Sequence, residues 1–483
     1  MCCLGEWGPT VTDSAGIRTE SFRSHQTRTA RGAAPREAGV GVRGANRGSM
    51  DAIFLALTGQ EWLVVKHQIF ALVANLMSWA MVTLGLRSTR MRLVPLADGP
   101  RDRAVSIASP GGYERFTFVP LGQQDGNTLA TTGYNVVEGV ERVAGQPSVV
   151  RLAGGAIPDE CILVRVQAFS INYADVTIRW GLYESAIRHV GYPIVPGFDF
   201  VGVVERAGAA SGFRAGDEVH GVTFFGAYSS RLLVPGKQAR KRPGKLSIAE
   251  AAAVPSVAGT ALHALALAGF WPKAPITTNK AVLVHSAAGG VGSMLVQMAR
   301  ALGADPVVAV VGAAHKVAAC RALGAHVVID KSSEDLWEAA ARAASGGFAA
   351  VFDANGVATL AASYRALAQS GHLVVYGFHT NLPSSDLINP FAWARMAAKL
   401  LRMPRFDPPD MVLAGRSVHG FNLSFFSQED ALIKAYMEQI DTWLAEARIR
   451  APAVTPFKMD EVPRAHQVIQ SGQSVGKLVI VTD

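Results

Sequence analysis

The chain has 483 residues, enough for two or three domains. Apolar residues make up 49% of it and charged residues 17%, so a mainly disordered protein is excluded. The net charge of +8 is spread along the chain, without zinc-finger spacing or an RNP-type segment, and this argues against nucleic-acid binding. Four cysteines without a C-x-x-C pair exclude a disulfide framework and a four-cysteine zinc site, and they indicate a reducing compartment.

The first 49 residues predict no packed element, because they show neither a two-residue nor a 3.6-residue apolar period. They contain seven arginines, no lysine and only four acidic residues, a composition typical of an organelle targeting segment. A disordered tail without a targeting role is the alternative. A third alternative is that this stretch is not translated, because Met50 could begin the protein.

Residues 50–92 contain a hydrophobic stretch at 69–86, eighteen residues without a charged side chain. As a helix it would be ~27 Å long, close to the ~30 Å hydrocarbon core of a bilayer. Three arginines follow it and would hold the rest of the chain in the cytoplasm or an equivalent organelle interior. The sequence therefore predicts either a membrane anchor or a packed helix on a cytoplasmic protein. Residues 93–130, rich in Gly, Pro, Asp and Arg, predict a linker.

The next stretch of the chain is rich in short strands and Gly or Pro turns and contains few helices. Its landmarks are the segments N-Y-A-D at 172–175, R-W-G-L-Y at 179–183, P-I-V-P-G-F-D-F-V-G at 193–202 and G-D-E-V at 216–219. A different pattern begins near residue 280.

Residues 280–286 form a short apolar run with β-branched side chains, which predicts a buried strand. The turn A-A-G-G-V-G follows, and the residues after it have helical apolar spacing. In this context one glycine lets a pyrophosphate approach the backbone, another lets the helix pack on the strand, and the helix N-terminus offers free N–H groups. The predicted cofactor-binding residues of this turn are Ala287, Gly289, Gly290, Val291 and Gly292.

Strands and helices then alternate as far as residue 376, which predicts a parallel, doubly wound sheet. The expected strands are 306–311, 326–329, 349–352 and 372–376, and the expected helices are 316–323, a segment after Asp330, and 359–369.

The end of the second strand indicates which dinucleotide is bound. A cofactor without a 2′-phosphate is normally held there by an Asp or Glu that accepts from the ribose hydroxyl. The strand ends instead at Gly312, with Lys316 close behind, and Asp305 precedes the strand. A small residue with a nearby lysine suits a 2′-phosphate, so NADPH is predicted. The alternative is that Lys316 is a solvated surface lysine.

These patterns together resemble the medium-chain dehydrogenase/reductase superfamily, in its zinc-independent quinone oxidoreductase branch, and most of all the synaptic vesicle membrane protein VAT-1 homologues. The motifs that carry the resemblance are VLVHSAAGGVG at 282–292, GFNLSFF at 420–426 and VGKLVI at 475–480. The similarity extends over about residues 131–483.

The resemblance implies an α/β fold of two domains that follow a disordered and hydrophobic helical extension. A GroES-like, mainly-β catalytic domain would occupy 131–255 and be completed by 423–483. A Rossmann domain that binds NADPH would occupy 256–422. The substrate would lie between the two domains.

Zinc-dependent members of the superfamily hold the metal with Cys, His and often Glu. The corresponding places here are Asn172 and Phe198–Asp199, which cannot supply a thiolate and an imidazole, so no metal is expected. The resemblance then implies hydride transfer to a conjugated carbonyl, with hydrogen-bond donors stabilising the developing oxyanion. The expected donors are Asn172 and Tyr183, with Tyr173 as a neighbour. Alternatively, Asn172 caps a turn and Tyr183 only packs.

Several further residues are expected near the cofactor. The resemblance places Phe378, Asn422 and Lys477 beside the nicotinamide half, and Asn355 follows the fourth strand of the sheet. Two other segments have open alternatives. The basic residues between 237 and 245 either touch anionic lipid or are solvated. The stretch 382–411 predicts an amphipathic helix that covers the site, forms an oligomer contact or packs on the core.

The sequence therefore predicts a zinc-independent, NADPH-dependent reductase of quinones or α,β-unsaturated carbonyls. An enoyl-thioester reductase is one alternative. Another is a membrane-associated protein that binds NADPH together with a lipid or a protein partner and has little catalytic activity. A small-molecule substrate is the expected partner, and superfamily members commonly form homodimers.

Overall fold

A computed structural model of the chain describes residues 102–122, 128–131, 140–272, 278–381, 390–425 and 429–482, together with Ile69 and Val73. All of them belong to one unit, residues 56–483. The tail at 1–49 and the hydrophobic segment at 69–86, apart from helical Ile69 and Val73, lie outside the described residues. Within the described part of the chain, no helix has the length and apolar character needed to cross a membrane.

The first domain, called here the mixed-sheet domain, is built around the long strand β6. Its strands have the order β10-β8-β7-β6-β9-β3-β5-β4, and β18 pairs with both β6 and β17. Ile162, Val164 and Val166 alternate along β6 and are buried in one core, because successive side chains of a strand point to opposite faces. The strands are β3 (Thr128–Thr131), β4 (Val140–Val143), β5 (Gln146–Leu152), β6 (Cys161–Ile171), β7 (Asp199–Ala207), β8 (Glu218–Val222), β9 (Arg231–Pro235), β10 (Ala239–Lys241), β17 (Val454–Lys458) and β18 (Lys477–Val481).

The linker expected at 93–130 is wrong for much of its length. Residues 103–120 contain the antiparallel pair β1 (Arg103–Ile107) and β2 (Phe116–Pro120). Val105 and Ile107 are fully buried in the core of the mixed-sheet domain, and Ile107 N donates to Ile194 O at 2.8 Å. Each of these strands is only five residues long, and the chain around them is rich in Gly, Pro and Arg. The alternation of inward and outward side chains is therefore too short to be recognised in the sequence.

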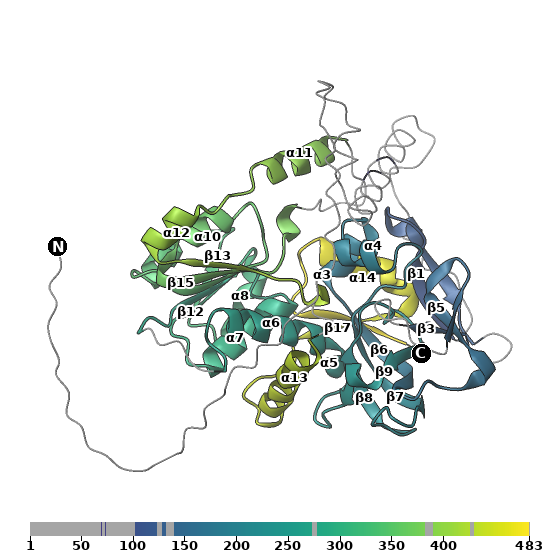
Figure 1. Cartoon of the computed structure of the whole chain (residues 1–483). Helices are drawn as coiled ribbons and strands as arrows, with labels where there is room; N and C mark the ends of the chain where they lie inside the picture. The colour runs from purple at the N-terminus through teal and green to yellow at the C-terminus, as the bar shows by residue number, and fades with distance from the viewer. Residues whose placement is uncertain are drawn as a thin grey trace, which may run out of the picture. The chain divides into compact units, whose positions relative to one another are not determined.

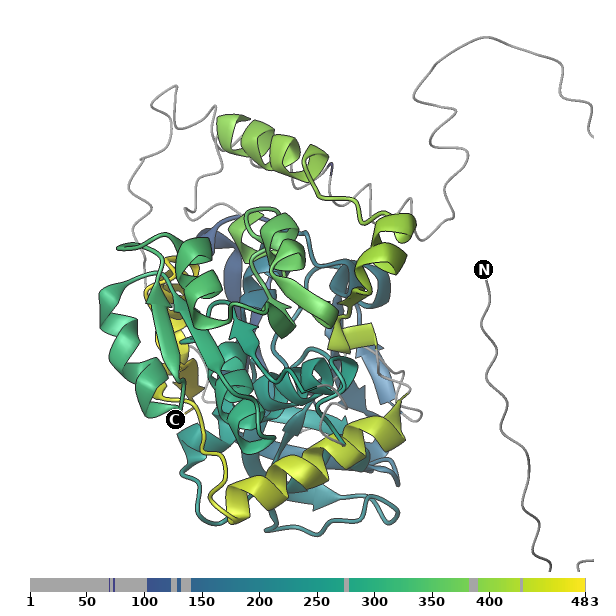
Figure 2. The same cartoon turned by 90° about the vertical axis from the view of Figure 1, so that its left-hand side faces the viewer.

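The second domain, called here the parallel-sheet domain, has the strand order β13-β12-β11-β14-β15-β16, with every pairing parallel. Figures 1 and 2 show this sheet with helices packed around it. Along β11, Val282 and Val284 join one core cluster and Leu283 joins another, so helices cover both faces. The strands are β11 (Val282–Val284), β12 (Val307–Val311), β13 (Val327–Asp330), β14 (Phe348–Asp353), β15 (Leu367–Val375) and β16 (Ser417–Gly420).

Helices connect these strands and link the two domains. They are α3 (Tyr173–Arg179), α4 (Glu184–His189), α5 (Ile248–Ala253), α6 (Pro255–Leu267), α7 (Gly290–Ala301), α8 (Val317–Ala322), α9 (Leu336–Ala343), α10 (Leu360–Arg365), α11 (Pro390–Leu401), α12 (Pro408–Ala414), α13 (Asp430–Ala445) and α14 (Val462–Gln470). The predicted α/β fold, with a mainly-β domain and a doubly wound parallel sheet, is confirmed.

Three details differ from the expectations. The helix expected at 359–369 ends at Arg365, because Leu367 already pairs with Phe348 as the start of β15. The helix α13 lies in the part expected to complete the catalytic domain, yet its Tyr436 and Trp443 are buried in a core of the parallel-sheet domain. The amphipathic helix expected within 382–411 is present as α11. Phe391 and Leu401 are 69% and 89% exposed, which does not fit packing of these two side chains on a core.

Candidate active site

Asn172 lies at the junction where β6 ends and α3 begins. Its backbone N–H donates to Asp175 Oδ2 at 2.8 Å, and Asp175 N donates back to Asn172 O at 3.0 Å, so the first turn of α3 is closed on itself. Asp175 is fully buried and also accepts from Gly197 N and from Tyr228 OH. Burial raises the pKa of Asp175 to about 7. Asp175 therefore has the structural role expected of a turn residue, and it fixes the backbone of Asn172.

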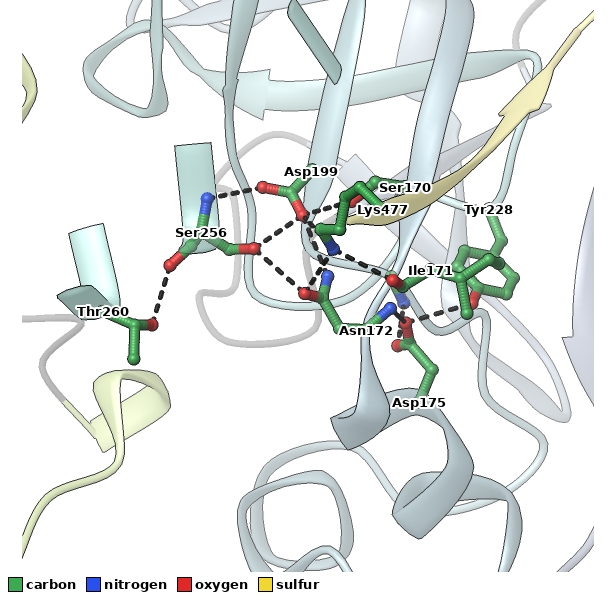
Figure 3. A network of polar contacts seen from close by, with 10 residues as sticks. Ser170, Ile171, Asn172, Asp175, Asp199, Tyr228, Ser256, Thr260 and Lys477 are labelled. Carbon is green, nitrogen blue, oxygen red and sulfur yellow. Dashed lines mark hydrogen bonds and ion pairs between the residues drawn. The ribbon is translucent and has the colours of Figure 1, made fainter. Parts of the chain in front are cut away.

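The side chain of Asn172 is held from two sides (Figure 3). Its Oδ1 accepts from Lys477 Nζ at 2.6 Å, and its Nδ2 donates to Asp199 Oδ2 at 2.9 Å. Ser256 Oγ lies 2.6 Å from Asp199 Oδ2 and 3.2 Å from Asn172 Oδ1. Within the described part of the chain, the second N–H of the Asn172 Nδ2 group has no acceptor. Asn172 as a residue is half-buried, and its Nδ2 group is fixed in place by Asp199.

Asp199 and Lys477 form a buried pair of opposite charges around Asn172. Asp199 Oδ1 accepts from Ser256 N at 2.6 Å, which places the carboxylate at the N-terminus of α6, where the helix dipole favours a negative charge. Lys477 Nζ donates to Ile171 O at 2.9 Å and lies 3.6 Å from Asp199 Oδ2. Burial lowers the pKa of Lys477, and the carboxylates of Asp199 and Asp175 oppose that shift.

Lys477 also touches the glycine-rich turn of the other domain. A Cβ atom built on Gly290 would lie 3.2 Å from Lys477 Cδ, and Gly289 forms a bridge with Gly476. The predicted cofactor residue Lys477 is therefore placed between this turn and Asn172, and its ammonium group binds Asn172. No group of three His, Cys, Asp or Glu side chains gathers as a metal site anywhere in the described residues.

Tyr183 and Asn422, expected to be a catalytic and a cofactor-binding residue, are in direct contact. Tyr183 OH lies 3.0 Å from Asn422 Oδ1 and 3.2 Å from Ser424 Oγ. The Tyr183 ring meets Phe198 and Phe225 edge-on. Burial raises the pKa of Tyr183, so its phenol is a hydrogen-bond donor and a weak acid near neutral pH.

Tyr173 links the two domains. It is the first residue of α3, its OH donates to His379 O at 3.2 Å, and its ring meets the His379 imidazole edge-on at 5.6 Å. Burial raises the pKa of Tyr173 to about 12. Tyr173 therefore holds the loop after β15 against the start of α3, next to Asn172.

The glycine-rich turn between β11 and α7 has the geometry of a phosphate cradle. Gly289 is the N-cap of α7 and has no side chain to cap the first N–H groups of this twelve-residue helix, so they are open to an anion. A Cβ built on Gly292 would lie 2.4 Å from Ser286 O and 2.7 Å from Ala287 Cα, which shows how closely helix and strand approach. Ala287 is buried, whereas Gly290 and Val291 are half-buried. These residues fit the pyrophosphate of a dinucleotide.

The end of β12 is bordered by basic residues from two segments. Lys316 Nζ donates to Gly472 O at 2.5 Å, and His315 Nε2 lies 3.1 Å from Gln473 O, so this corner is tied to the turn after α14. Lys331, which sequence analysis missed, follows β13. Its backbone N–H donates to Val311 O, and its Cε lies 3.5 Å from where a Cβ of Gly312 would be. The small Gly312 with Lys331 against it and Lys316 four residues further on fits a phosphate group on a ribose.

Residues from three strand ends meet where ligands of doubly wound sheets bind. Ser286, after β11, donates through Oγ to Asn355 Oδ1 at 3.0 Å and lies 3.4 Å from His379 Nε2. Asn355, after β14, is buried, whereas Phe378, after β15, is 48% exposed. Of these four residues, Asn355 and Phe378 were predicted, and Ser286 and His379 were not.

Comparison with known proteins identifies the family. The alcohol dehydrogenase GroES-like domain matches residues 158–257, and the zinc-binding dehydrogenase family matches residues 290–433, so the two together cover about half of the chain. The two matches follow one another along the chain in the same order as the mixed-sheet domain and the parallel-sheet domain. The chain belongs to the medium-chain dehydrogenase/reductase superfamily.

Individual members of this superfamily show the branch to which the chain is similar. The synaptic vesicle membrane protein VAT-1 homolog of Danio rerio is 27% identical over 356 residues, covering 74% of this chain and 70% of the relative. The probable quinone oxidoreductase of Schizosaccharomyces pombe is 28% identical over 343 residues, covering 70% of this chain and 94% of the relative.

Solved structures of superfamily members share the fold. The human synaptic vesicle membrane protein VAT-1 homolog-like protein has a TM-score of 0.58 and 22% identity, covering 79% of this chain and 98% of its own. The Escherichia coli quinone oxidoreductase, solved as a complex with NADPH, has a TM-score of 0.59 and 22% identity over 78% of this chain and 99% of its own. The predicted resemblance to the quinone oxidoreductase branch and to VAT-1 homologues is confirmed.

Six of the sequence-predicted residues are brought together by three contacts. Asn172 meets Lys477, Tyr183 meets Asn422, and Tyr173 meets the loop that carries Phe378. Asp199 and Ser256 were not predicted as partners of Asn172. The sequence did contain a signal for Asp199, because a charged residue between two phenylalanines, in F-D-F, is unusual unless it has a buried partner. Nothing in the local pattern marks Ser256, which enters only through the fold.

Proposed function

We propose that this chain is an NADPH-dependent reductase that transfers hydride to a quinone or an α,β-unsaturated carbonyl without a zinc ion. The observation that carries the proposal is the amide of Asn172, which Lys477 and Asp199 hold at two of its atoms next to a turn that fits a pyrophosphate. Two structural neighbours, an Escherichia coli quinone oxidoreductase and a mycobacterial protein, are described as complexes with NADPH, which supports this choice of cofactor.

The residues at the parallel-sheet domain would hold the cofactor. Gly289 and the N-terminus of α7 would take the pyrophosphate, and Lys331 with Lys316 would take the 2′-phosphate. When bound, NADPH supplies a hydride. The ammonium group of Lys477 contacts Asn172 and lies 3.6 Å from Asp199 Oδ2. Because it balances the negative charge of Asp199, the proposal needs no metal ion for that purpose.

The chain's own side chains would then stabilise the product oxygen. Asn172 offers a rigid N–H, and this kind of preorganised donor typically contributes about 10²–10³ in kcat. Tyr183, whose ring is held by Phe198 and Phe225, would donate its O–H to the product oxygen in exchange for Asn422 Oδ1, its acceptor in the structure. Because burial raises the pKa of both Tyr173 and Tyr183, these phenols hold hydrogen bonds but do not readily release protons near neutral pH.

The proposal is tested on the full chain by following oxidation of NADPH and of NADH with a panel of quinones, enones and an enoyl thioester. We expect turnover with NADPH and a quinone or enone. Asn172→Ala should lower kcat about 10²-fold or more while leaving the Kd of NADPH unchanged. Turnover confined to the enoyl thioester would replace the proposed substrate class by that alternative. Tight NADPH binding without turnover of any acceptor would contradict the proposed reaction.

A further inference from the structure

The carboxamide of Asn172 lies in an electric field made by two buried charges. The ammonium of Lys477 is 2.6 Å from Oδ1, and the carboxylate of Asp199 is 2.9 Å from Nδ2 (Figure 3). Both charged side chains are almost completely buried, with 4% and 0% of the side chain exposed, so water screens them weakly. The positive charge is therefore at the oxygen end of the amide and the negative charge at its nitrogen end.

This arrangement changes the amide itself. An amide has a resonance form with negative charge on oxygen and positive charge on nitrogen. A cation at the oxygen and an anion at the nitrogen both favour that form, and hydrogen bonds linked in this way strengthen one another by about 10–30% per bond. The cation at the oxygen makes both N–H groups of the amide stronger donors. The carboxylate of Asp199 accepts from one of them and fixes the direction of the other, but does not itself strengthen that second N–H.

The two charges are themselves held in place by groups from distant parts of the chain. Asp199 accepts from Ser170 Oγ and from both the N–H and the hydroxyl of Ser256, so its oxygens cannot turn away. Lys477 donates to Ile171 O as well as to Asn172. Every hydrogen bond in this network fixes the direction of the Asn172 amide.

We propose that Lys477 polarises Asn172 and that Asp199 orients it, so that the remaining N–H of Asn172 is the main donor to the negative charge that develops on the substrate oxygen. This inference rests on the proposed function and names the origin of its strongest donor. Lys477 and Asp199 are positioning residues in this account, because they act through Asn172. The assignment differs from the sequence-based expectation that Lys477 binds the cofactor.

The first test is spectroscopic and needs neither cofactor nor substrate. In the full-length chain labelled with ¹⁵N at asparagine, the side-chain N–H signals of Asn172 are identified by their loss in Asn172→Ala. We expect them downfield of ordinary asparagine amides, and we expect Lys477→Met to move them upfield while the side-chain signals of Asn279 stay in place. Unchanged Asn172 signals in Lys477→Met would overturn the proposal.

The second test is a double-mutant cycle on turnover. Lys477→Met should lower kcat about 10²-fold, as expected when a catalytic donor is misplaced, and leave the Kd of NADPH unchanged. In the Asn172→Ala background, Lys477→Met should have no further effect. Independent, multiplying effects, or a loss of NADPH affinity as large as the loss of kcat, would overturn the proposal.

A variant that lacks both charges serves as the control for folding. Lys477→Met alone leaves Asp199 buried without its partner, which is destabilising, whereas Lys477→Met with Asp199→Asn leaves no net buried charge. We expect this double variant to fold and still to turn over slowly, and wild-type turnover in it would overturn the proposal. Lys237→Met with Asp430→Asn, which removes an exposed ion pair, is the matched control and should keep full activity. If the wild-type chain reduces no acceptor, the proposed function fails, and the spectroscopic test still decides the polarisation.

Discussion

Two glycines in the turn between β11 and α7 should respond differently to replacement by alanine: Gly292→Ala should mainly lower stability, and Gly289→Ala should mainly weaken NADPH binding. At Gly292 the new methyl group would lie 2.4 Å from Ser286 O and 2.7 Å from Ala287 Cα. Both atoms belong to the backbone and cannot swing aside. At Gly289 the nearest atom is Ser286 O at 3.3 Å, and the backbone conformation, with φ −80° and ψ 177°, suits any residue.

The magnitudes follow from these contacts. Overpacking costs about 1–3 kcal/mol, and the severe contacts place Gly292→Ala at the upper end, offset by up to ~1 kcal/mol from the better helix propensity of alanine. We therefore expect Gly292→Ala to lose about 2 kcal/mol of unfolding free energy. Gly289→Ala should lose less than ~1 kcal/mol, the cost of a poorer N-cap. It should nevertheless weaken NADPH binding at least about tenfold, because the methyl group would project where the pyrophosphate approaches.

The assays are denaturant unfolding and a fluorescence titration with NADPH, with Gly346→Ala as control because its new methyl group meets no atom within 4 Å. Gly346→Ala should match the wild type in both. The reasoning is refuted if Gly292→Ala unfolds at the same denaturant concentration as the control, or if Gly289→Ala binds NADPH as tightly as the wild type.

Three further outcomes are expected. Lys331→Met should raise the Kd of NADPH about tenfold and leave that of NADH unchanged, since only NADPH carries the 2′-phosphate, and equal losses for both would contradict this. Tyr183→Phe should lower kcat without changing the Kd of NADPH. If kcat and NADPH affinity fell equally, Tyr183 would have only a packing role in the site. Burial lowers the pKa of His285 to about 4 from 6.5. The stability that this neutral histidine contributes, about 3 kcal/mol, is present above pH 6.5 and is lost as the pH falls towards 4. His285→Gln should flatten the dependence of unfolding free energy on pH in this range, and an unchanged slope would show that another group is responsible.

The sequence predicted the parallel-sheet domain well because its signals are local. The apolar run that ends at Val284, the glycines at 289–292 and the helix after them lie within about twenty residues and each dictates its own geometry. The same locality explains why the strands after them could be placed to within a few residues. In contrast, β1 and β2 are short and lie in a polar stretch, and only their burial in the mixed-sheet domain shows what they are.

The sequence named part of the candidate site but none of the contacts within it. Asn172 was expected to act as a donor, yet its partner Lys477 is 305 residues away in the chain, and Ser256 is 84 residues away. No periodicity connects residues so far apart. The register of β18 against β6 brings Lys477 to Asn172, and Ser256 comes from the first turn of α6. Lys331 was missed for a related reason, because β13 places it beside Gly312 through parallel pairing with β12.

The central claim is that the chain transfers hydride from NADPH to a conjugated acceptor. The most direct measurement supplies NADPH deuterated at the transferring position of the nicotinamide, together with an enone, and locates the deuterium in the product by NMR. The account predicts one deuterium at the β-carbon in the wild-type product and a much slower appearance of the same product with Asn172→Ala. Deuterium that is absent from the β-carbon, or product that forms equally fast with Asn172→Ala, would contradict it.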